Sequence, residues 1–174
     1  GYQLKGEYPP GLTGIELLNL KNIWQDTWRH SKISFFWTLF VYPFNPNFAF
    51  TRMLVDAFDD ELSLFDKLNQ THRFYGFAGA DAEAKLKLWG DSYMRFPSYE
   101  TLFSIARNHI LIKSELTGSL AQDQKKVSDA LRNGQFYLSV DILQNPRGFE
   151  SYVTGPSNVQ APLGAKLKYQ EGLE

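Results

Sequence analysis

The carboxylates that could do chemistry in this chain gather behind a short apolar segment. Asp81 and Glu83 stand two positions apart, directly after residues 74–79, a run of aromatic and small residues. Such a run is typical of a strand that approaches a closely packed site. Side chains at the carboxyl ends of parallel strands point into an open mouth, where α/β folds build their sites. Two carboxylates there could hold a divalent cation or act as acid and base; alternatively, Asp81 caps the next turn and Glu83 faces water.

A third carboxylate, Glu16, interrupts the apolar segment 15–20. An ionised carboxylate that is buried without a partner costs several kcal/mol, so we expect a buried Glu16 to be paired with a cation, an arginine or a proton. The alternative is that Glu16 lies at a strand edge and faces water. Both interpretations place it on a strand.

Several residue types and motifs that other kinds of active site need are absent from the sequence. The chain has no cysteine, and its three histidines, His30, His72 and His109, form no His-x-His or His-x-x-x-His pair, so we expect them to be structural. It also lacks Gly-x-Gly-x-x-Gly, a Walker loop and Gly-x-Ser-x-Gly, which removes support for nucleotide-loop and serine-hydrolase chemistry. These patterns leave the catalytic residues unknown.

Composition sets the class of protein and of partner. The 174 residues are 43% hydrophobic and 21% charged, enough apolar material for one compact unit or part of a larger one. The formal net charge of −1 argues against a nucleic-acid partner. The most apolar stretch, residues 33–42, is shorter than the ~20 residues that span a bilayer, so we expect no membrane span. Neither a cytoplasmic nor a periplasmic location is excluded.

Periodicity and helix breakers predict the elements that must position the carboxylates. Apolar runs predict strands at 15–20, 74–79, 109–112 and 136–141. Helices are expected within 24–42, over 53–68 as one helix or two short ones, after Ser98 and over 122–133. Pro43 stops the first and Gly134 the last. Alternating strands and helices favour an α/β fold with parallel strands.

Several motifs together resemble a known family. They are GIE at 14–16 followed by Asn19, FAGADA at 77–82, FPSYE at 96–100, NHIL at 108–111 and ALRNGQFY at 130–137. Over residues 11–153 the chain resembles the C-terminal half of bacterial PHP-domain proteins (polymerase and histidinol phosphatase type). The combination is much more specific than any one motif.

The resemblance implies a fold, an activity and a set of metal ligands. The fold would be part of a distorted (β/α)7 TIM-like barrel, related to the amidohydrolases. Family members hydrolyse phosphate esters with two or three metal ions such as Zn, Mn or Fe, so a small phosphate ester is the implied substrate. Glu16 corresponds to the family's metal-bridging glutamate and Asp81 to a second ligand. Glu83 stands where the family has the histidine of Asp-x-His, and an oxygen donor there favours harder cations.

The family's early His-x-His motif is absent from these residues. We therefore expect residues 1–153 to be the C-terminal part of a PHP-like barrel, inactive alone, whose parent is a metal-dependent phosphoesterase. One alternative is a non-catalytic PHP-like module that binds a ligand or a protein, and another is a self-contained fold with an unrelated role. Residues 154–174 are expected to be a linker and the start of a truncated segment, ending in a pair that cloning sites often leave. Exposed strand edges of a partial barrel predict self-association.

Overall fold

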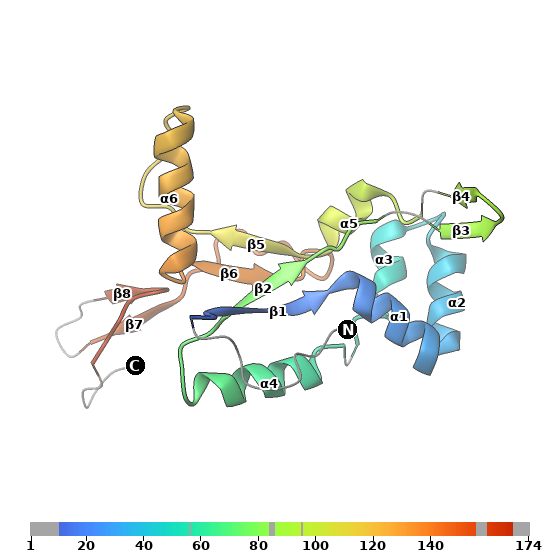
Figure 1. The fold of residues 1–174 in the computed structure, drawn as a ribbon, viewed down its shortest axis with the longest axis horizontal. Coiled ribbons are helices and arrows are strands. Elements are labelled where there is room, and N and C mark those ends of the chain that lie inside the picture. Colours follow the sequence, from blue (N-terminus) through green and yellow to red (C-terminus); the bar gives the residue numbers. More distant parts are fainter. Residues whose placement is uncertain (1–10, 56, 84–85, 95, 156–159, 169–174) are drawn as a thin grey trace. The chain divides into compact units, whose positions relative to one another are not determined.

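The computed structural model describes residues 11–55, 57–83, 86–94, 96–155 and 160–168 (Figure 1). The chain divides into two units. The first runs to Arg107 and also takes in Val140–Asn145, and the second comprises Asn108–Ser139 and the chain from Pro146 onwards. The three candidate carboxylates all belong to the first unit.

The centre of the first unit is a parallel pair of strands, β1 (Gly14–Asn19) and β2 (Tyr75–Gly79). Glu16 pairs with Phe77 and Asn19 pairs with Gly79, with an irregularity in register between Glu16 and Leu18. Leu18 is 1% exposed and belongs to the core. Both predicted strands are confirmed, and because they are parallel, their carboxyl ends share one edge.

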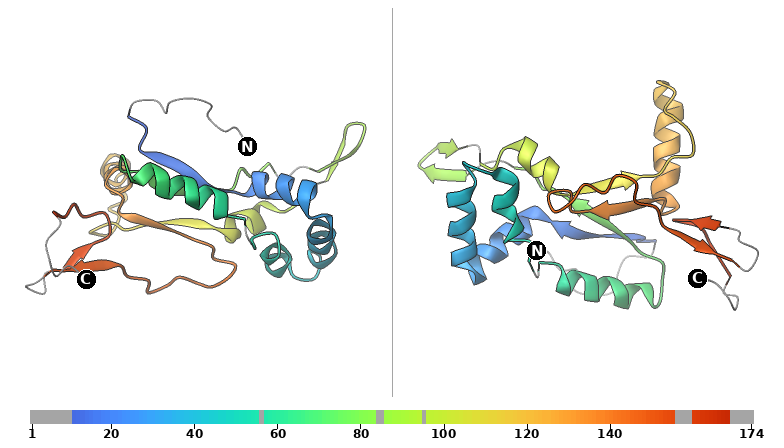
Figure 2. Two further views of the ribbon diagram at one scale, coloured as in Figure 1. Left: turned by 90° about the horizontal axis from the view of Figure 1, so that it is seen from below. Right: turned by 180° about the vertical axis from the view of Figure 1, so that it is seen from behind.

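Four helices connect these strands: α1 (Leu20–His30), α2 (Lys32–Val41), α3 (Pro46–Thr51) and α4 (Asp59–Asn69). Figures 1 and 2 show α1, α2 and α3 clustered beyond the carboxyl ends of β1 and β2, while α4 packs against β1. Local capping sets the helix starts. The Asn19 side chain accepts a hydrogen bond from the Asn22 N–H (2.9 Å), and Asn45 caps α3 ahead of Pro46.

The helix expected within 24–42 is two helices that meet at Ser31, and the one expected over 53–68 begins only at Asp59. Ser31 has φ −139° and ψ 70°, outside the helical region, so its backbone separates α1 from α2. The helix after Ser98 is α5 (Tyr99–Ile105), and the Ser98 side chain accepts from the Thr101 N–H (3.2 Å). Ahead of it, β3 (Leu86–Trp89) and β4 (Ser92–Met94) form an antiparallel pair.

Two side-chain hydroxyl groups tie the helices of the first unit together. Thr38 is fully buried, and its Oγ1 lies 3.0 Å from the carbonyl oxygen of Ser34 and 2.9 Å from that of Ala49. The Tyr42 hydroxyl accepts a hydrogen bond from the Ser98 N–H (2.8 Å), which joins the end of α2 to the start of α5. Although burial acts to raise the pKa of Tyr42, its hydrogen bonds with Ser98 and Thr101 outweigh burial and lower it.

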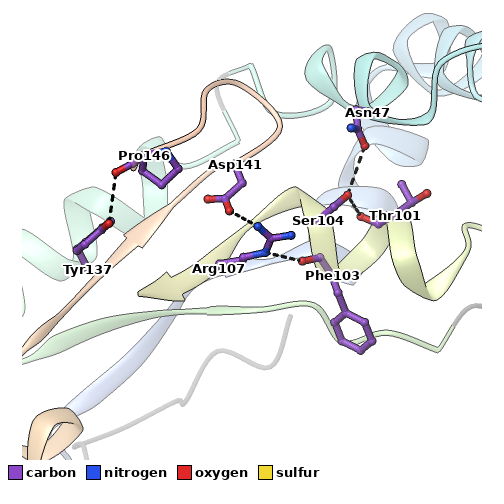
Figure 3. Close-up of polar contacts among 8 residues, drawn as sticks. All are labelled: Asn47, Thr101, Phe103, Ser104, Arg107, Tyr137, Asp141 and Pro146. Atoms are coloured by element: carbon purple, nitrogen blue, oxygen red, sulfur yellow. Dashed lines mark hydrogen bonds and ion pairs between the residues drawn. The ribbon is translucent and has the colours of Figure 1, made fainter. Parts of the chain in front are cut away.

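An ion pair links the segment Val140–Asn145 to the residues that follow α5 in the first unit. Arg107 Nη1 lies 2.8 Å from Asp141 Oδ2, and the Asp141 side chain is only 8% exposed (Figure 3). Arg107 Nε also donates to the carbonyl of Phe103 (3.3 Å), at the end of α5. The segment Val140–Asn145 is therefore held against the first unit by a charged hydrogen bond.

The second unit contains β6 (Phe136–Ser139) and all of β5 (Arg107–Ile110) except its first residue. The two strands are neighbours in one sheet and point in opposite directions (Figure 1). Between them, α6 (Leu120–Arg132) is followed by Gly134 at φ 68°, the predicted glycine stop. A further pair, β7 (Tyr152–Thr154) and β8 (Gln160–Pro162), is antiparallel. The His109 ring stacks on Tyr137, with 4.8 Å between centroids.

The predicted partial (β/α)7 TIM-like barrel is wrong for the residues that the structure describes. They form a mixed α/β structure with four separate two-stranded sheets and no closed barrel. Barrel closure requires each strand to pair on both sides, whereas each of these strands, three to six residues long, has one neighbour. β1 and β2 keep the expected parallel arrangement; β5 and β6 do not. Over the described ranges, no helix is long and apolar enough to cross a membrane.

The buried Thr38 hydroxyl gives a stability prediction. Thr38→Val keeps the shape of the side chain but leaves the Ala49 carbonyl without this donor, so we expect the free energy of unfolding to fall by about 1–2 kcal/mol. The matched control is Thr51→Val, which removes a hydroxyl bonded within its own exposed turn and should cost less than about 0.5 kcal/mol. Urea denaturation measures both; equal effects would contradict the assignment.

The outer face of α2 gives a prediction about assembly. Ile33, Phe36 and Phe40 recur along it, and their exposed fractions are 74%, 58% and 74%. Because burying such a face between two copies removes apolar surface from water, we expect concentration-dependent self-association that Phe40→Ser weakens. Sedimentation velocity checks this, with Leu120→Ser as a control that changes an equally exposed apolar residue of the second unit. A wild-type chain that stays monomeric at high concentration would refute it.

Candidate functional site

Glu16 reaches from β1 across to the end of β2. Its Oε2 accepts a hydrogen bond from Asn19 Nδ2 (2.8 Å), and its Oε1 occupies the space beside Gly79. A Cβ atom built on Gly79 would clash with that oxygen, so any other residue at position 79 would displace the Glu16 carboxylate. Glu16 is exposed, so its carboxylate faces water, as in the second interpretation, and an amide supplies its partner.

Asp81 and Glu83 follow β2 and share one cation that the sequence reasoning missed. Lys21 Nζ lies 2.6 Å from Glu83 Oε1 and 3.6 Å from Asp81 Oδ2. Lys21 lies in the first turn of α1, directly after β1. A basic residue just beyond the strand that carries Glu16 was the available signal, because parallel pairing brings the end of β1 beside the end of β2.

The backbone at this edge is tightly turned. Asp81 has φ 40°, the only positive φ of a non-glycine residue in the described segments, and the Glu83 N–H donates to the Asp81 carbonyl (2.9 Å). Aspartate tolerates the left-handed region better than most residues. The turn brings both carboxylates to the same ammonium group, so the two predicted residues after β2 do come together.

The carboxylates keep Lys21 charged. The hydrogen bond to Glu83 is the largest influence, and with the negative charges of Asp81 and Glu83 it outweighs desolvation and raises the pKa of Lys21. A raised pKa means that the ion pairs stabilise the fold fully below the ordinary lysine value and lose that effect as pH rises through the shifted one. Because all three side chains are more than a third exposed, salt will screen the pairs.

The structure only partly assembles the ligand set that the resemblance implies. The Glu16 carboxylate lies beside Gly79, two positions before Asp81, and the oxygens of both residues suit a hard divalent cation by donor type. Glu83 is already bound by an ammonium group. Across the described ranges, no three His, Asp or Glu side chains are grouped so as to hold a metal ion, and His30 and His72 bond locally instead.

A cavity of about 240 Å³ opens beside Lys21, Asp81 and Glu83. Its other walls come from α1, from α3 and the turn after it, and from the region of α5, and most of them are apolar. Comparison with protein families, curated proteins and solved structures found no match for this chain.

The close approach of Glu16 to Gly79 gives a third prediction. Gly79→Ala displaces the Glu16 carboxylate, which is exposed and can turn into water, so we expect a loss of about 0.5–1.5 kcal/mol in the free energy of unfolding, the net contribution of its hydrogen bond with Asn19. In a Glu16→Ala background the added methyl group displaces no carboxylate, and its cost should fall below about 0.5 kcal/mol. Denaturation of the four proteins of this cycle checks the coupling, and strictly additive effects would show that the two residues do not touch.

Proposed function

We propose that Glu16 and Asp81 belong to a metal-dependent phosphoesterase centre of the PHP type, whose other ligands come from outside these 174 residues. The observation that carries this is the parallel pairing of β1 and β2, with the Glu16 carboxylate lying against Gly79, two positions before Asp81. A carboxylate beside the carboxyl end of β2 supports the proposal, because α/β proteins build their sites at the carboxyl ends of strands.

In such a centre, bound divalent cations would polarise the phosphoryl oxygens and supply a water of lowered pKa as the nucleophile. Glu16 and Asp81 would hold the cations, and their oxygen donors favour Mn²⁺ over softer choices such as Zn²⁺. Asn19 fixes the direction of the Glu16 carboxylate through a 2.8 Å hydrogen bond, as a supporting residue of a metal ligand does. Lys21 partly neutralises the acidic edge that a phosphate must approach.

A second candidate is a non-catalytic PHP-like module that binds a ligand or a protein. The observation in its favour is the ammonium group of Lys21, which already lies within ion-pair distance of Asp81 and Glu83. Where a lysine supplies the positive charge, no metal ion is needed to offset the repulsion between the carboxylates.

Metal content and phosphatase activity of the whole gene product distinguish the two. We expect Glu16→Gln and Asp81→Asn each to remove bound metal, with at least ~100-fold loss of phosphomonoesterase activity, because each removes a charged ligand. The control is Asp66→Asn, an exposed acid of α4, which should change neither.

Metal bound equally by wild type, Glu16→Gln and Asp81→Asn would refute the proposed centre. A folded wild type without metal would favour the non-catalytic module. In that outcome, Lys21→Met combined with Glu83→His tests whether the lysine stands in for the metal, because it removes the internal cation and adds a nitrogen donor, and a gain in Zn²⁺ binding is expected.

A further inference from the structure

We propose that the cavity beside Lys21 is the subsite for the organic group of a phosphate ester, and that it selects a single aromatic ring or a short alkyl group over a sugar. This assignment rests on the proposed function, because the phosphoryl group would lie at the strand edge that carries Asp81. The cavity touches Asp81 and Glu83 directly, so a molecule inside it reaches the proposed centre.

The polarity of the walls argues for an apolar occupant. Charged groups line one side only, at Lys21, Asp81 and Glu83, and among the other lining residues Gln25 alone is polar. A sugar placed here would bury hydroxyl groups against rings and methyl groups without hydrogen-bond partners, which is costly. An aromatic ring or an alkyl chain has no hydroxyl groups that would lose hydrogen bonds with water. Its burial is favourable because it removes apolar surface from water.

The size of the cavity argues for a small group. Its volume of about 240 Å³ is below the roughly 300–1,000 Å³ of sites for drug-sized ligands. One ring suits that space better than a nucleoside, which adds a sugar to its base.

The apolar wall is held in place by packing. The Trp24 ring contacts Phe96 edge to face, with 5.6 Å between centroids, and Phe35 at 4.7 Å. Phe50 and Met53 are only 6% and 4% exposed. Side chains fixed in this way lose little further freedom when a ligand enters, so the subsite is organised in advance.

Trp24 also reports on binding, because it lines the cavity. The first probe is benzyl alcohol, which carries the ring without the phosphate, and glycerol is its polar counterpart. In NMR titrations of the chain without metal, we expect saturable shifts of the Trp24 indole N–H and the Met53 methyl group with benzyl alcohol, at millimolar affinity, and none with glycerol. Trp24→Phe assigns the indole signal.

Two variants localise the binding. Ala80→Leu extends a side chain that lines the cavity and should weaken benzyl alcohol binding by at least ~10-fold. Phe40→Ser changes the exposed face of α2 and should leave binding unchanged. If Ala80→Leu does not fold, the Trp24 and Met53 shifts of the wild type still locate the probe. Equal responses to glycerol, or benzyl alcohol shifts on α2 alone, would overturn the proposal.

Binding measurements on the whole gene product with added Mn²⁺ distinguish this proposal from the proposed function. With Mn²⁺ present, phenyl phosphate should bind at least ~10-fold more tightly than glycerol phosphate, and calorimetry measures both. Ring binding that Mn²⁺ and phosphate do not strengthen would overturn the phosphate-ester assignment and the proposed centre together. Mn²⁺ that binds through Asp81 without any preference for phenyl phosphate would overturn the subsite alone.

Discussion

The candidate site depends on the parallel pairing of β1 with β2. The pairing brings Asn19 opposite Gly79, and the missing side chain at Gly79 leaves room for the Glu16 carboxylate. Without the parallel direction, the carboxyl end of β1 at Asn19 and that of β2 at Gly79 would lie at opposite edges, because antiparallel strands end at opposite edges of a sheet. The four helices between the two strands are the connection that makes a parallel pair possible.

Charge at this edge is balanced locally. Lys21 lies in the first turn of α1, directly after the end of β1. Its ammonium group forms ion pairs with two carboxylates that follow β2. The carboxylates at this edge can bind a divalent cation, or they can keep their ion pairs with Lys21. The two candidate functions differ in this one respect, which is why they share almost every residue.

The helices beyond the strand edge form the walls of the cavity, and hydroxyl groups of two residues help to hold their mutual arrangement. Thr38 joins α2 to α3, and the Tyr42 hydroxyl joins α2 to α5. Aromatic rings around Trp24 fill the space between them. This combination gives a rigid apolar wall next to a charged edge, the arrangement that a phosphate ester with an apolar group would require.

The sequence by itself determined the strands that carry Glu16 and precede Asp81, the glycine stop of α6 and the cap at Ser98, because local apolar runs, glycine and capping side chains encode them. It could not determine that Glu16 reaches Gly79 or that Lys21 binds Glu83, since each contact joins residues more than sixty positions apart. The predicted barrel was wrong for the same reason, because strand number and direction depend on long-range pairing. Only the tertiary structure decided which strands meet.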